Sequence, residues 1–238
     1  MPSTPAVLAT NRLLSSLPDK DYRHLLKHCE IVDLKPDDLL EDSGEPIDHA
    51  YFPIDSAIAL VMPMEGGSGL EAALIGNEGM LGIALMLGVD VAPFRAVVQS
   101  AGSALRITAP SFLRELEHSP ALKRQLNRYI YVLLSQLVQT ATCTRFHVVL
   151  ERLARLLLMI RDRAHADEFH ITQEVLAKML GVRRVGVTKA ASLLQKKKLI
   201  SYSRGDVRIL DIAGLEAASC ACYQADKATY ARIMHFPP

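Results

Sequence analysis

The sequence predicts an α+β protein: an N-terminal antiparallel β-roll, then a long helix, then a small helical domain with a β-hairpin. Residues 31–107 contain short apolar runs separated by turn-forming clusters such as "DLKPDD" and "EDSGEP", which is typical of antiparallel strands. After Pro120 the apolar residues recur at helical spacing. We therefore expect three parts, at residues 1–118, 119–144 and 145–238.

The charge of the chain is unevenly distributed. Residues 1–144 contain 11 Lys/Arg and 17 Asp/Glu, whereas residues 145–238 contain 16 and 9. A net charge of +7 in the last part favours a polyanionic partner for that part alone. Half of the 238 residues are hydrophobic, so a sizeable core is available.

The apolar runs, the cysteines and the N-terminal segment predict where the protein works in the cell. The longest apolar run, Gly79 to Ala92, is too short to span a bilayer and is expected to be buried core. The four cysteines do not form a dense secreted framework, and no charged segment followed by an apolar core opens the chain. These observations predict a cytoplasmic protein with no membrane partner.

The helix expected from about Pro120 to Thr142 has an apolar stripe at 4-3-4-3-4 spacing, which is typical of a coiled-coil seam. We interpret it as the seam of a homodimer. The alternative is an amphipathic helix that packs on its own domain. The stripe consists of Leu122, Leu126, Tyr129, Leu133, Gln136 and Thr140.

The C-terminal part predicts a helix-turn-helix. Thr172 is a candidate N-cap, Gly181 lies where one helix must turn into the next, and Val187 belongs to the buried face of the second helix. A β-hairpin is expected around Ser203–Asp206, and a closing helix is expected to start after Asp211 as N-cap.

The segment "MLGVRRVGVTKAASLLQKKK" is a poor and self-repelling helix in isolation, because it has a glycine in its middle and six positive charges without a negative one. Residues 171–204 hold eight Lys/Arg and one acid. Both features suit double-stranded DNA, and we interpret Gly186 as permitting close approach to it. The expected base contacts are Arg183, Arg184, Val185, Thr188 and Lys189. The expected phosphate contacts are Thr172, Gln173, Lys178, Lys196, Lys197 and Arg204. The alternative is a basic, solvated helical hairpin.

The run from Ile171 to Ala217 resembles the winged helix-turn-helix of the Crp/Fnr superfamily of bacterial transcription regulators, and the order of elements extends this resemblance over nearly the whole chain. The resemblance implies a cyclic-nucleotide-binding-type β-roll, a long dimerisation helix, a palindromic operator and RNA polymerase as a further partner. The family segment Gly-Val-Ser-Arg-Glu-Thr-Val-Ser-Arg stands here as "GVRRVGVTK". Arg184 keeps the arginine that can contact guanine, whereas Val185 replaces the glutamate.

The resemblance also places a candidate effector pocket at Gly82, Ile83, Arg95 and Ala96. Ile83 stands where cyclic-nucleotide-binding members have a glutamate that holds the ribose, so cyclic AMP is disfavoured. Arg95 either binds another anionic effector or pairs with a nearby acid. No other cofactor is evident, and a small effector, if one exists, is unknown.

Other candidate chemistry is sparse. Cys220 and Cys222 could form a redox or metal pair, but on one helix residues two apart point away from each other, which favours two buried small residues and no metal site. His24 and His28 could share a haem or metal, although surface histidines are the commoner case. No catalytic motif is present, and we expect no enzyme. Whether an effector gates the regulator is open at this point, and two alternatives remain. One is a switch gated by an anionic small molecule at Arg95. The other is a constitutive binder or interaction protein whose β-roll is a dimer scaffold or a contact surface for RNA polymerase.

Overall fold

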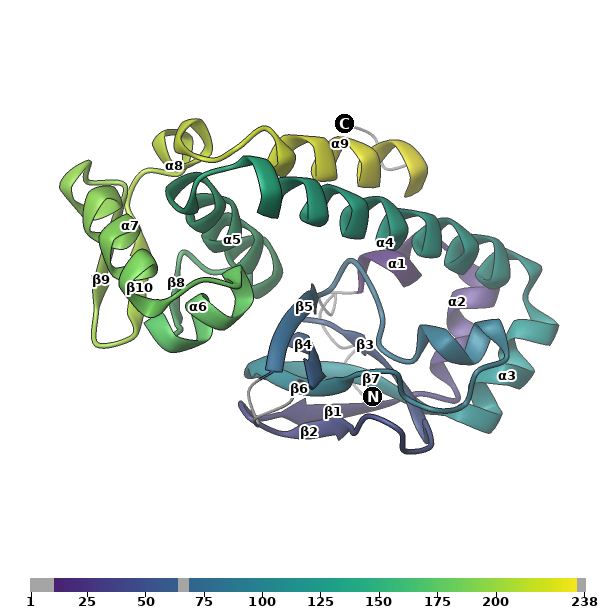
Figure 1. The fold of residues 1–238 in the computed structure, drawn as a ribbon. Helices are drawn as coiled ribbons and strands as arrows, with labels where there is room; N and C mark the ends of the chain where they lie inside the picture. The colour runs from purple at the N-terminus through teal and green to yellow at the C-terminus, as the bar shows by residue number, and fades with distance from the viewer. Residues whose placement is uncertain (1–10, 64–68, 235–238) are drawn as a thin grey trace, which may run out of the picture. The chain divides into compact units, whose positions relative to one another are not determined.

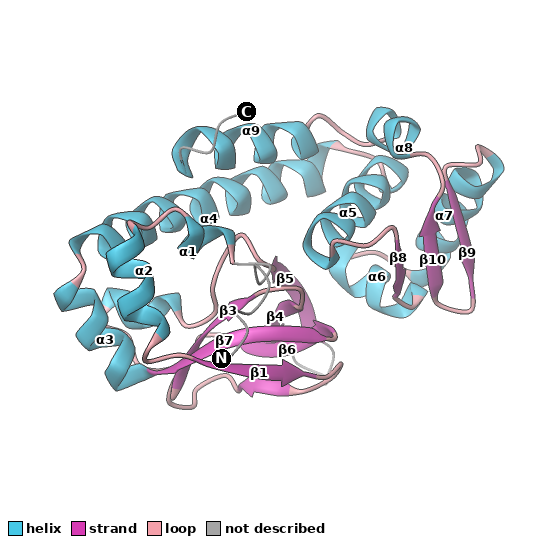
Figure 2. Ribbon diagram, turned by 180° about the vertical axis from the view of Figure 1, so that it is seen from behind, coloured by secondary structure: helices cyan, strands magenta, loops and turns pink. Residues whose placement is uncertain are grey.

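A computed structural model describes residues 11–63 and 69–234 and confirms the α+β class. The strands gather in an N-terminal group and a smaller C-terminal group, with helices elsewhere (Figure 2). The chain divides into two compact units, residues 1–58 with 75–129 and residues 59–74 with 130–238. Within the described residues, no helix is both long and apolar enough to cross a membrane.

The N-terminal strands form two sheets. One has the order β1 (Glu30–Leu34), β7 (Gly102–Thr108), β3 (His49–Pro53), and the other has the order β2 (Leu39–Glu41), β6 (Arg95–Ser100), β4 (Ala57–Pro63), β5 (Gly69–Ile75). The β1–β7, β3–β7 and β2–β6 pairings are antiparallel, as predicted. The consecutive strands β6 and β7 join different sheets. Gly102 stands at the crossing, where a Cβ would lie 2.7 Å from the Asp55 backbone.

Helices complete the N-terminal part. They are α1 (Arg12–Ser15), α2 (Asp19–Leu26), the 3₁₀ helix η1 (Ile83–Leu87) and α3 (Ala109–His118), followed by the long α4 (Pro120–Phe146). Phe112 of α3 packs on Phe52 of β3, with ring centroids 6.3 Å apart. Both side chains are fully buried, so this contact anchors α3 to the first sheet.

The C-terminal elements follow in chain order: α5 (Val149–Ala164), β8 (Glu168–His170), α6 (Gln173–Leu180), α7 (Arg184–Lys196), β9 (Ile200–Ser203), β10 (Asp206–Ile209), α8 (Ile212–Ala218) and α9 (Cys222–Met234) (Figure 1). The three strands form a sheet of order β8-β10-β9. Asp211 caps α8 as predicted, accepting a hydrogen bond from Gly214 N. The expected single closing helix is in fact two, because residues 219–221 interrupt it.

The first half of the predicted seam of α4 is corrected by the structure. Leu122, Leu126 and Tyr129 are buried within the protomer, so the alternative interpretation, a face that packs on its own chain, holds for them. Leu133, Gln136 and Thr140 are half-buried, and a dimer contact by these three stays a prediction. A different face of α4 is apolar and exposed, at Tyr131, Leu134, Leu137 and Val138.

Candidate nucleic-acid interface

The turn between α6 and α7 is built as the sequence predicts. The Thr172 side chain caps α6, accepting a hydrogen bond from Val175 N at 3.3 Å. Gly181 ends the helix with φ +60°, a left-handed conformation that costs other residues about 1 kcal/mol or more. Arg183 is extended and precedes the first residue of α7, Arg184.

The two faces of α7 differ sharply. Its buried residues are Val187, Ala190, Ala191 and Leu194, and α7 packs against both α5 and α6. All five residues predicted to contact bases are exposed: Arg183, Arg184, Val185, Thr188 and Lys189. Val185 is 58% exposed, so most of this apolar side chain is in contact with water in the single protomer. The apolar face therefore holds the basic N-terminal turn of α7 outward.

One expected base contact is already engaged within the domain. The Thr188 hydroxyl lies 2.6 Å from Gln173 Oε1 and 3.1 Å from the Arg184 carbonyl oxygen. Thr188 thus links the first turns of α6 and α7, and Gln173 orients it. The structure does not oppose a base contact by Thr188, but it assigns the hydroxyl a role in fixing the two helix starts.

The residues predicted to contact phosphates lie along α6, at the C-terminal end of α7 and between β9 and β10. Thr172, Lys196, Lys197 and Arg204 are exposed, and Gln173 is half-buried. Lys178 is exposed as well, with Nζ 3.9 Å from Glu174 Oε1. An exposed pair of this kind is worth at most about 1 kcal/mol, so Lys178 can exchange Glu174 for a phosphate at little cost.

The hairpin tip has unusual backbone geometry. Arg204 and Gly205 form the two-residue loop between β9 and β10, with φ +53° and +96°. Positive φ at both loop positions is the type I′ pattern, which favours Asn-Gly. A Cβ at Gly205 would lie 2.5 Å from the His170 ring. Arg204 therefore occupies a position that suits Asn better, which is consistent with selection for its charge.

Arg204→Asn should separate DNA binding from folding. Asn suits the turn, so thermal stability should be unchanged or slightly higher. Loss of one phosphate contact should weaken binding to all duplexes alike and reduce the slope of log K against log salt by about 0.9. Fluorescence anisotropy titrations at several salt concentrations measure this slope.

Arg208→Gln is the matched control, because Arg208 lies on β10 of the same hairpin and its Nε is 3.0 Å from Glu168 Oε1. It should leave the slope unchanged. Equal slopes for wild type and Arg204→Asn would remove Arg204 from the interface.

The interpretation of Gly186 is wrong. A Cβ at this position would point into the domain, 3.9 Å from Val182 Cγ2 and 4.0 Å from Val149 Cγ1. These are ordinary van der Waals distances, and they place the missing side chain on the protein side of α7. Gly186 therefore gives DNA no closer approach, and alanine would fit there.

At the candidate effector pocket, the arginine is paired with an acid. Gly82 adopts φ +86° before η1, Ile83 begins η1 and Ala96 is buried. Arg95 Nε lies 3.0 Å from Asp42 Oδ1, and each side chain is about half exposed. Of the two alternatives for Arg95, the structure shows the pairing with a nearby acid.

Glu41, beside Ala96 on the neighbouring strand, is a half-buried acid whose buried Oε1 atom has no hydrogen-bond partner among the described residues. Burial raises its pKa from 4.5 to about 7. As pH rises, the Glu41 carboxyl group thus ionises in the unfolded chain before it does so in the folded protein. The free energy of unfolding should therefore fall between about pH 4.5 and pH 7. Glu41→Gln should abolish this fall and stabilise the protein at pH 8 by up to about 3 kcal/mol.

Urea unfolding at pH 5 and pH 8 measures the difference. Glu30→Gln is the control, because Glu30 is exposed and pairs with Arg106 at 2.8 Å. An undiminished pH dependence in Glu41→Gln would contradict the assignment.

Among residues 11–63 and 69–234, two side-chain clusters could hold a metal. His24 Nδ1 lies 2.9 Å and His28 Nε2 3.6 Å from the carboxylate of buried Glu115, so these histidines share an acid at the surface. The second cluster joins Cys220 and Cys222 to Cys143 and His147. The expectation that Cys220 and Cys222 diverge on one helix is wrong, because Cys220 precedes α9.

Comparison with known proteins agrees with this geometry. Residues 151–218 match the model of the Crp-like helix-turn-helix domain. Residues 151–218 therefore form a Crp-like helix-turn-helix domain. No curated protein matches it in sequence.

Solved structures share the fold at low identity. FixK2 from Bradyrhizobium japonicum has a TM-score of 0.69 and 15% identity, over 81% of this chain and 98% of that one. A Crp/Fnr-family transcriptional regulator from Thermus thermophilus has a TM-score of 0.61 and 21% identity, over 80% and 98%. The c-di-GMP-responsive global regulator CLP from Xanthomonas campestris has a TM-score of 0.61 and 16% identity, over 81% and 99%.

Proposed function

We propose that this protein is a transcription regulator of the Crp/Fnr type, a homodimer that recognises a palindromic operator through the major groove. The observation that carries the proposal is the exposed row on α7, from Arg183 to Lys189, held by a fully buried opposite face. A recognition helix contacts bases with its N-terminal residues, and two such helices contact half-sites about one turn of DNA apart. Binding to chromosomal DNA implies work in the cytoplasm, and a contact with RNA polymerase stays a prediction.

Two residues of the row define the expected half-site. Arg184 offers a guanidinium that can donate to O6 and N7 of one guanine. Val185, apolar and exposed, suits a thymine methyl group in place of the cytosine amine that a glutamate would accept from.

Val185→Glu should therefore change the preferred base at one position of each half-site and leave the other positions as they are. Parallel selections from random duplex DNA, read by sequencing for wild type and variant, test this. Identical profiles would remove Val185 from the base-contacting set.

The dimer surface that the structure favours is the exposed face of α4. Tyr131, Leu134, Val138 and Ala141 follow one another at 3-4-3 spacing, and all are exposed. This is heptad spacing, so a second copy of the same helix can pack its own stripe against it about a twofold axis. A palindromic operator requires that symmetry.

The combination of Leu134→Glu and Val138→Glu should yield a folded monomer with weakened operator binding. Sedimentation velocity gives the mass, and anisotropy gives the affinity. Leu113→Glu, at an exposed apolar position on α3, is the control and should remain dimeric. A dimer that survives the double substitution would place the interface elsewhere.

We further propose that cyclic AMP is not the effector. Ile83 offers no acceptor for a ribose hydroxyl, and Asp42 already occupies Arg95. A ligand-gated switch is the second candidate function: CLP, a protein of this fold, is described as c-di-GMP-responsive, and an anion at Arg95 would have to displace Asp42. Thermal melting with cyclic AMP and with c-di-GMP distinguishes the cases, and we expect no shift from cyclic AMP.

A further inference from the structure

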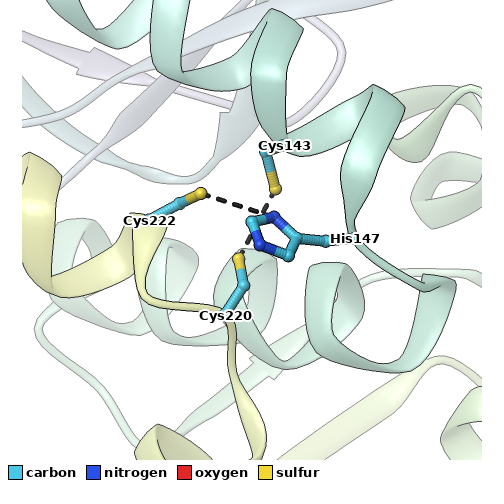
Figure 3. A group of neighbouring side chains, drawn as sticks. All are labelled: Cys143, His147, Cys220 and Cys222. Atoms are coloured by element: carbon cyan, nitrogen blue, oxygen red, sulfur yellow. Dashed lines mark hydrogen bonds between the residues drawn. The ribbon is translucent and has the colours of Figure 1, made fainter.

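Three cysteines and one histidine converge in the C-terminal part of the chain. The Sγ atoms of Cys143, Cys220 and Cys222 and a ring nitrogen of His147 all lie within 4.8 Å of one another (Figure 3). Cys143 Sγ is 3.5 Å from Cys220 Sγ, and Cys222 Sγ is 3.5 Å from His147 Nδ1. Figure 3 shows all four side chains turned toward a common centre.

These separations suit a single tetrahedral ion. Zinc–sulfur bonds of about 2.3 Å and zinc–nitrogen bonds of about 2.0–2.1 Å give tetrahedron edges of about 3.8 Å between sulfurs and about 3.6 Å between sulfur and nitrogen. The two measured edges fall just short of these values. A cluster of several irons and sulfides requires its ligand sulfurs farther apart than one ion does.

The backbone explains why four residues distant in sequence meet. Cys143 lies in the last turn of α4, and His147 follows four residues later, with its N–H bonded to the Cys143 carbonyl oxygen at 3.1 Å. Cys220 lies in the break before α9, and Cys222 is the first residue of α9. Because the break precedes the helix, the two side chains turn to the same side.

Neighbouring side chains offer the sulfur atoms of the cluster a hydrogen-bond donor and a positive charge. All three cysteines are buried and none is in a disulfide. Gln139 Nε2 donates to Cys222 Sγ at 2.9 Å, and the Arg155 guanidinium interacts electrostatically with the Cys143 side chain. Donors aimed at sulfur are the outer-shell partners that orient metal ligands, and a cation offsets the −1 charge that three thiolates leave on Zn²⁺.

We propose that Cys143, His147, Cys220 and Cys222 bind one structural Zn²⁺ ion. Four protein ligands leave no open position, which is the pattern of structural zinc and not of catalytic zinc. The ion ties the start of α9 to the end of α4, immediately before α5 leads into the helix-turn-helix. Removing it should therefore loosen the attachment of α9.

Metal content of the full-length, tag-free protein, purified under reductant, tests the proposal. Elemental analysis should find one zinc per protomer in the wild type. The same amount should remain in Cys29→Ser, the control that alters the one cysteine of the sequence outside the cluster. Cys143→Ser and Cys222→Ser should lose the zinc, and chelation of the wild type should lower its melting temperature.

Because serine variants can fail to fold, the stripped wild-type protein provides a second measurement. Titration with Co²⁺ should give sulfur-to-cobalt charge-transfer bands and the intense visible bands of tetrahedral cobalt, saturating at one equivalent. No bands and no zinc would overturn the site. Iron with acid-labile sulfide, or a Cys143–Cys220 disulfide under reductant, would overturn it too. None of these readouts involves DNA, so they leave the proposed regulator function independently testable.

Discussion

Replacing Arg184 with alanine is expected to weaken binding to the selected operator by about 10- to 100-fold. A bidentate arginine–guanine contact discriminates by about 1–3 kcal/mol, and each 1.4 kcal/mol is tenfold in affinity. Arg184 is the first residue of α7, it is exposed, and α7 is fixed by four buried side chains. Binding to unrelated duplexes should fall far less, because only one charge is lost there.

The comparison depends on a matched loss of charge. Lys198→Gln removes one positive charge just beyond the C-terminal end of the same helix, where Lys198 is exposed and far from the N-terminal turn in sequence. Lys198→Gln should lower the affinity for the operator duplex and the affinity for an unrelated duplex by the same small factor. Equal losses for both duplex types in Arg184→Ala would reduce Arg184 to a phosphate contact. Competition titrations with both duplexes at one salt concentration give these ratios.

Replacing Asp226 with asparagine is expected to lower the free energy of unfolding by about 3–5 kcal/mol. Asp226 of α9 accepts from Arg155 of α5 at 2.6 Å, and the two side chains are 13% and 7% exposed. Burial raises the pKa of Asp226 more than Arg155 lowers it, so the pair itself stabilises little. Removing the carboxylate, however, leaves the buried guanidinium without its ion pair.

Asp167→Asn is the control, because the Arg161–Asp167 pair has the same 2.6 Å distance while Asp167 is 54% exposed. That variant should cost less than about 1 kcal/mol. The double variant Arg155→Met with Asp226→Leu should recover most of the lost stability, since no charge remains buried. Equal effects of Asp226→Asn and Asp167→Asn in urea unfolding would contradict the assigned role of burial.

The helix-turn-helix could be predicted because its signals are local. The cap at Thr172, the glycine at position 181 and the alternation between Val187 and its charged neighbours all act within one helical turn, and the structure has each of them. β8 was missed for the opposite reason. Its three residues contain one apolar side chain, and pairing with β10, 36 residues away at His170 and Asp206, defines the strand.

The two main errors also arose from long-range contacts. Heptad spacing on α4 shows that the helix has apolar faces, but not whether Leu126 meets its own chain or a second copy. The cysteines illustrate the same limit, because Cys143 and Cys220 are 77 residues apart and no ligand spacing connects them. Only the break before α9, which the sequence does not mark with proline or glycine, turns Cys220 toward Cys143.

Selection of random duplex DNA by the purified, ligand-free protein at moderate salt tests the central claim most directly. We predict enrichment of a palindrome whose half-sites lie about one helical turn apart, with a guanine in each half-site that is lost in Arg184→Ala. Salt-sensitive binding without any enriched sequence would contradict the claim that this helix recognises an operator unaided.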